Sequence, residues 1–121
     1  MRSIRWSARA ARETGTGLDL ATLGESTRER LLQVLPAEAS VENPVDMLGS
    51  ATQETFRAAL PIILEDSGID AVIVLFVPVV GVDEDEVGAA ISRAAREAGD
   101  KTVLCAFLSA RGAPASLRSA A

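Results

Sequence analysis

The chain contains no histidine, one cysteine and few aromatic residues. Without histidine it cannot use Ser-His-Asp or Cys-His catalysis, bind a metal through imidazole, or carry a phosphohistidine. A single cysteine cannot form an intramolecular disulfide, and Cys105 lies in the apolar run 102–108, where we expect a buried, unreactive thiol. These absences exclude those kinds of site, and we assign no catalytic residue and no metal site to this chain. Because aromatic residues make up only 3% of the sequence, the core must consist of Leu, Val, Ile and Ala.

The sequence also lacks long apolar runs and an excess of positive charge. No segment reaches the roughly 18 uninterrupted apolar residues of a membrane-spanning helix, and the first residues lack the apolar core of a signal peptide. Cytoplasmic location, with no membrane partner, is the default expectation. The net charge of −5 disfavours a nucleic-acid partner, and we interpret the arginines at 2, 5, 9 and 12 as a solvated helix end or terminus. The 121 residues suit one domain.

Hydrophobic periodicity predicts alternating helices and strands. From the N-terminus we expect a helix at 7–13, a strand at 17–21, a helix from Ser26 to Pro36, a helix at 52–66, a strand at 71–76, a helix from Asp83 to Gly99, a strand at 102–107, and a helix beginning at Pro114. Ser26 with Glu29, and Asp83 with Glu86, fit the capping-box pattern. Pro61 lies inside a helical segment and predicts a kink or a break there.

The second half of the chain indicates the fold class. The run 71–76 is continuously apolar and rich in β-branched residues, which is typical of a strand buried on both faces of a parallel sheet. From residue 52 onward the order helix, strand, helix, strand predicts an open, mostly parallel α/β sheet with helices on both faces. In such sheets, ligands bind beyond the carboxyl ends of the strands, near helix starts.

Two of these helix starts differ in charge. The start at 83–86 carries four consecutive acids, which would repel an anion, so we interpret it as a well-capped, solvated helix. The other start consists of Gly49, Ser50, Ala51 and Thr52 and has no charge. Its amides and hydroxyls could receive a phosphate or carboxylate oxygen. The alternative is that Ser50 or Thr52 simply caps the helix, as at many helix starts.

The residues just before this stretch are Asn43, Pro44 and Asp46. Pro44 fixes its own φ, and the side chains of Asn43 and Asp46 could shape the loop by bonding nearby backbone groups. Asp46 as a general base is the less favoured alternative, since no partner is visible.

The stretch from about residue 18 to residue 112 resembles the last flavodoxin-like domain of the CoA-binding part of NDP-forming acyl-CoA synthetases, a family that includes the ADP-forming acetate–CoA ligases. It is similar, more distantly, to the C-terminal domain of the succinyl-CoA synthetase β subunit. The resemblance rests on four pieces of sequence: Leu23–Arg28, Asn43–Asp46 followed by Gly49–Thr52, Gly68–Pro78, and Val103–Phe107 leading to Arg111 and Gly112. The combination in the second piece, ahead of the strand in the third, is the most specific part.

The resemblance implies a chemistry and a set of partners. Such enzymes form an acyl-CoA from an acid, CoA and a nucleoside triphosphate, through an acyl phosphate and a phosphohistidine on a swinging loop. This domain would frame the site where that loop docks, while CoA, ATP or ADP, and Mg would act in the complete enzyme and not bind to this chain alone. The implied partners are the CoA-binding, phosphohistidine and ATP-grasp domains of a synthetase.

The two ends depart from the family pattern. Residues 1–6 do not look like the apolar strand and Gly-rich turn that open the family domain, and the family continues past 111–114 into another strand and helix. We therefore expect an atypical N-terminal segment at 1–16, a partial flavodoxin-like domain at 17–112, and the start of a truncated helix at 113–121. The leading hypothesis is a domain fragment that is inactive alone.

Two alternatives remain from the sequence. One is a docking module for separately encoded synthetase subunits. The other is a receiver-like signalling domain, which would need an acidic residue at the end of a central strand to accept a phosphate. The strand at 71–76 is followed by Val77 and Pro78, which disfavours this second alternative.

Overall fold

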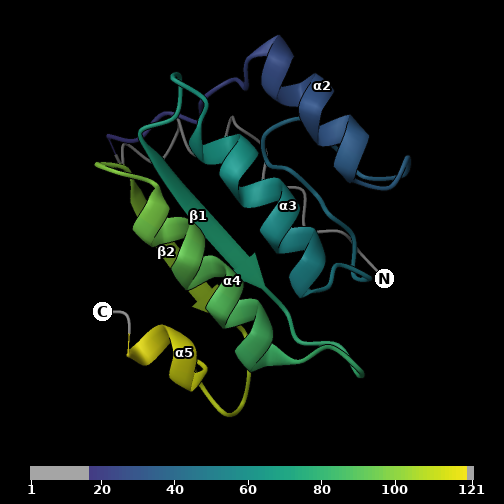
Figure 1. Ribbon diagram of the computed structural model, residues 1–121, viewed down its shortest axis with the longest axis vertical. Coiled ribbons are helices and arrows are strands. Elements are labelled where there is room, and N and C mark those ends of the chain that lie inside the picture. Colours follow the sequence, from purple (N-terminus) through teal and green to yellow (C-terminus); the bar gives the residue numbers. More distant parts are fainter. Residues whose placement is uncertain (1–16, 120–121) are drawn as a thin grey trace.

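The computed structural model describes residues 17–119 (Figure 1). Its elements are α2 (Glu25–Val34), α3 (Gln53–Leu64), β1 (Ala71–Phe76), α4 (Glu84–Glu97), β2 (Thr102–Phe107) and α5 (Ala115–Arg118). The helix expected at 7–13 lies outside the described residues. From α3 to β2 the order helix, strand, helix, strand is the predicted one, and both strands have the predicted bounds.

The two strands pair in parallel, from Ala71 opposite Thr102 to Phe76 opposite Phe107. A parallel pair needs a crossover, which α4 provides. The ring of Phe76 packs edge-to-face on Phe56 of α3 at 5.8 Å between centroids, and lies 4.8 Å from the ring of Phe107. This arrangement confirms an open parallel α/β sheet.

Within the described residues, helices α3 and α4 pack on one face of the sheet, and α4 lies in front of β2 in Figure 1. This main core consists of Ala51, Phe56, Leu60, Leu64, Val74, Phe76, Val87, Ala90, Ile91 and Ala94. On the opposite face, the side chains of Ile73 and Leu75 are each 60% exposed. The expectation that this strand is buried on both faces is therefore wrong here. Apolar composition alone could not show which face the described helices cover.

A second core joins α2 to α3. Leu31 of α2 is fully buried and packs with Ala59 and Ile62 of α3 and with Ile69, just before β1. The strand expected at 17–21 does not form, because these residues have no strand pairing. A short alternating run can become a strand only where a partner strand lies beside it.

Three local predictions at helix ends and at Pro61 had different outcomes. Helix α2 begins at Glu25 with Gly24 as its N-cap and no side-chain cap, so the Ser26 capping box is wrong. Asp83 caps α4 as expected, since its Oδ1 accepts the N–H groups of Asp85 and Glu86 at 2.9 and 3.2 Å. Helix α3 continues through Pro61 to Leu64 without a break. Pro61 lies in the last turn, where its missing N–H removes a single helical bond.

Candidate functional site

The candidate site lies at the carboxyl end of the sheet. Helix α3 runs antiparallel to β1, so the start of α3 lies at the end where β1 finishes (Figure 1). The loops that lead into α4 and α5 lie at this same end (Figure 1). The structure therefore brings three chain segments to one edge: residues 40–52, 77–83 and 108–114.

The first of these segments is held by its own backbone and by two predicted residues. Ser40 and Asp46 exchange N–H···O bonds of 3.0 and 2.9 Å, which close the loop between them. Within it, the Asn43 side-chain amide donates to the carbonyl of Ala21 at 2.8 Å, which ties the loop to the segment before α2. Asn43 is joined to the exposed Pro44 by a cis peptide bond. The hydrogen bonds of Ser40, Asp46 and Asn43 fix the loop that leads to the start of α3.

Asp46 makes a second, local contact. Its Oδ1 accepts the N–H of Leu48 at 2.9 Å, and Leu48 has the left-handed φ of 68°. The carbonyl of Leu48 then accepts the N–H of Ala51 at 3.2 Å. This turn directs the chain into α3. With its Oδ1 bonded in this turn, Asp46 has no visible base partner among the described residues.

The four residues of the uncharged helix start do not all remain available to a ligand. The amide of Ala51 is bonded to Leu48, and the amide of Thr52 donates to Oγ1 of Thr55 at 3.1 Å. Ala51 is also buried in the main core. For the amides of Gly49 and Ser50 we find no bond within residues 17–119, and both residues are exposed. A side chain added at Gly49 would meet nothing within 4 Å, so this position faces open space.

Charged side chains connect this helix start to the next one. Arg57, in the first turns of α3, pairs with Glu54 and also with Glu86 of α4, at 3.0 Å between Nη2 and Oε2 in the second pair. Glu86 therefore bonds across to α3 and does not complete the capping box of α4. Sequence reasoning missed Arg57, whose ion pairs join the first turns of α3 to the start of α4.

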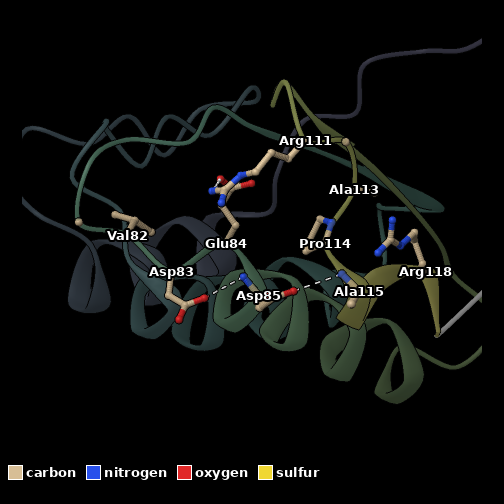
Figure 2. A pocket seen from close by; sticks show the side chains of 11 residues that line it. Val82, Asp83, Glu84, Asp85, Arg111, Ala113, Pro114, Ala115 and Arg118 are labelled. Atoms are coloured by element: carbon tan, nitrogen blue, oxygen red, sulfur yellow. Dashed lines mark hydrogen bonds and ion pairs between the residues drawn. The ribbon is translucent and has the colours of Figure 1, made fainter.

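An open hollow lies between the start of α4 and residues 111–118 (Figure 2). Arg111 reaches over it to Glu84, with Nη2 at 2.7 Å from Oε1, and Asp85 accepts the N–H of Ala115 at 3.2 Å. Its lining includes none of the predicted site residues from 43 to 52. The hollow and the candidate loop are thus separate places on the same edge of the domain.

A buried carboxylate, which sequence reasoning also missed, lies in the turn between α3 and β1. Asp66 is 8% exposed and accepts the N–H groups of Gly24 and Gly68, each at 2.8 Å. The pKa of Asp66 lies below its usual value, chiefly because of a hydrogen bond from the Thr27 side chain and then because of those two N–H groups. The nearby charge of Lys101 lowers the pKa further, whereas burial opposes these effects by raising it. Asp66 thus binds the start of α2, and we assign it a structural role.

Neither a metal site nor a reactive thiol is evident in the described part of the chain. No group of three or more His, Cys, Asp or Glu residues within 17–119 is arranged to hold a metal ion. Burial raises the pKa of the Cys105 thiol to about 11, so the thiol is protonated at neutral pH. Among the described residues, no helix is long and apolar enough to cross a membrane.

Comparison with known proteins gives related sequences and a related structure, although no family model matches the chain. Acetate–CoA ligase (ADP-forming) I of Archaeoglobus fulgidus is 34% identical over 92 residues, which is 76% of this chain and 12% of that ligase. Acetate–CoA ligase (ADP-forming) II subunit alpha of Pyrococcus furiosus is 38% identical in an alignment 95 residues long, which covers 76% of this chain and 21% of that subunit.

A crystal structure of a protein from Pyrococcus horikoshii shares the fold, with a TM-score of 0.74 and 35% identity. The match covers 92% of this chain and 25% of the other. The chain therefore spans only 12 to 21% of the length of the two curated relatives that it matches.

Proposed function

From the homology of this chain to a segment of the ADP-forming acetate–CoA ligases, we propose that it is a partial flavodoxin-like domain of an acyl-CoA synthetase. In a complete enzyme it would frame the site where the phosphohistidine and the acyl phosphate exchange a phosphoryl group. By itself the chain would form no acyl-CoA. The observation that carries this proposal is 34 to 38% identity over three quarters of the chain to two such ligases.

The geometry of the carboxyl edge supports a framing role. Asn43 and Asp46 hold the loop in one shape, and the exposed residues Gly49 and Ser50, whose amides have no bond within residues 17–119, lie just before the N-cap Thr52 of α3. A helix start favours negative charge nearby, because its first N–H groups have no helical partner. We assign the anion contact to Gly49 and Ser50, with Thr52 as the helix cap and Ala51 as its anchor in the core.

The remaining chemistry would come from other domains. The chain has no histidine, so the phosphorylated group must be supplied by a partner domain. We propose the CoA-binding, phosphohistidine and ATP-grasp domains of a synthetase as those partners, and CoA and ATP or ADP as ligands of the complete enzyme. No group of three or more His, Cys, Asp or Glu residues within residues 17–119 is placed to hold a metal ion, and we assign no step to magnesium in this chain.

A chimeric ligase tests the proposal. The matching segment of the Pyrococcus furiosus subunit alpha would be replaced by residues 17–119 of this chain, in the complete ligase, and acetyl-CoA formation measured with acetate, CoA and ATP. We expect an active chimera. Within it, Ser50→Pro, which removes an exposed amide, should lower kcat by about tenfold or more, as expected for an oxyanion donor. Glu25→Pro at the first residue of α2 is the matched control and should leave kcat within about twofold, because the preceding Gly24 is already extended.

Two results would refute the proposed function. Acetyl-CoA formation by the isolated chain would show that it carries the missing chemistry itself. A chimera that folds and assembles but loses as much activity with Glu25→Pro as with Ser50→Pro would show that the segment leading into α3 has no special role.

A further inference from the structure

Among the residues that the structure describes, one face of the β1–β2 sheet is apolar, carries no charged side chain and is exposed. Ile73 and Leu75 of β1 and Leu104 of β2 lie on it, each 56 to 60% exposed. Val77 and Leu108, which directly follow the two strands, are 55% and 64% exposed. We call these five residues the bare face. The other strand positions on this face are Ala71, Thr102 and Ala106, so neither strand places a charged side chain on it.

The area of the bare face is large for a chain of this size. Five half-exposed Leu, Ile and Val side chains present on the order of 500 Å² of apolar surface, which is near the upper end of the largest patch on a typical monomer. Two such faces packed together would bury on the order of 1,000 Å², about the lower limit for a specific interface.

The shape of the bare face suits a second copy of itself. In the strand register, Ile73 lies beside Leu104, whereas Leu75 lies beside the small Ala106. The face therefore has a ridge of two large side chains next to a row with a gap. Two sheets that pack face to face interdigitate large and small side chains across about 10 Å. A two-fold axis would place the ridge of each copy over the gap of the other.

We propose that the isolated chain forms a two-fold symmetric dimer through the bare face. The absence of charge on the face favours a copy over a charged partner surface, because the contact then buries no unpaired charge. This inference does not rest on the function proposed above. The estimated area indicates a weak dimer, with a dissociation constant in the micromolar range.

Sedimentation velocity of the full chain tests the dimer. Measurements from about 1 to about 500 µM should show a monomer that converts to a dimer, with no larger species. Leu104→Lys should raise the dissociation constant at least tenfold, because the interface would then bury an unpaired charge. Leu32→Lys is the matched control: Leu32 lies on α2, has the same 56% exposure, and should change the constant less than twofold. Circular dichroism would verify that both variants fold.

Each other result overturns the proposal. A dimer that is equally sensitive to both substitutions does not use the bare face, and open-ended oligomers exclude a closed two-fold pair. A monomer at all concentrations also excludes it. If the chain stays monomeric, the fluorescence emission of Trp6, the single tryptophan, would test whether the first 16 residues occupy the face instead. A response of that emission to Leu104→Lys but not to Leu32→Lys would place the first 16 residues on the face. Binding of the monomer to a ligase lacking the homologous segment would identify synthetase domains as the occupant.

Discussion

Removing the Asp66 carboxylate should destabilise the domain more than any other single change to a polar side chain that we consider. Asp66 is 8% exposed and accepts hydrogen bonds from the amides of Gly24 and Gly68 and from the side chain of Thr27. A hydrogen bond to a charged acceptor contributes about 1.5 to 3 kcal/mol, and bonds that share one carboxylate do not add fully. We therefore expect Asp66→Ala to lower the free energy of unfolding by about 3 kcal/mol. Asp66→Asn, which keeps one acceptor oxygen, should cost about half of that.

Urea unfolding followed by circular dichroism measures both values. The control is Asp70→Asn, since Asp70 is exposed and lies four residues further along the chain. It should change the free energy of unfolding by less than about 0.5 kcal/mol. If Asp66→Ala proves no more destabilising than this control, the carboxylate does not hold α2 in place.

The pH dependence gives an independent check on the same carboxylate. Because the pKa of Asp66 is lower in the folded state than its ordinary value of 3.8, its contribution is fully present above that value. It is lost as the pH falls through the lower, folded pKa. The stability difference between the wild type and Asp66→Asn should therefore be constant from pH 7 to about pH 5 and shrink below about pH 4. A difference that stays constant down to pH 3 would contradict the role of the charge.

Two further predictions concern the interior. Leu31→Ala should lower the free energy of unfolding by about 3 kcal/mol, because it leaves a cavity at the fully buried contact between α2 and α3. The control Leu32→Ala should lower it by less than about 0.5 kcal/mol. Equal effects of the two substitutions in urea unfolding would disprove the packing of α2. Since the pKa of the Cys105 thiol is about 11, labelling by a thiol reagent at pH 8 should be about a hundredfold slower in the folded chain than in urea. Equal rates would show that the thiol is not shielded.

The strongly patterned segments could be predicted from sequence because their local and tertiary preferences agree. The runs at 71–76 and 102–107 are rich in β-branched and apolar residues, and both are strands with those bounds. The helix between them has an acidic N-cap at Asp83 and a glycine just past its end, where Gly99 takes a left-handed φ of 66°. Such signals act over a few residues and need no distant partner.

The sequence predicted where the candidate site lies, but not which of its amides remain unbonded. The residues from Asn43 to Thr52 do lead into a helix at the carboxyl edge of the sheet, so their place could be predicted from the order of elements. Which amides remain unbonded could not be predicted, because that depends on the turn at Leu48 and on the bond from Thr52 to Thr55. The contact of Arg57 with Glu86, 29 residues further along, has no local signal at all.

By itself the sequence determined the α/β class, both strands, the cap of α4 and the likeness to acetate–CoA ligases, because each of these is set by neighbouring residues or by a run of matching ones. Only the tertiary structure decided that α2 starts at Glu25, because the carboxylate of Asp66, 42 residues further along, accepts the N–H of the N-cap residue Gly24. It also decided that residues 17–21 stay outside the sheet and that Ile73, Leu75 and Leu104 face outward. Whether a strand is paired, and on which face it is covered, depends on what packs beside it, and a one-dimensional pattern does not carry that information.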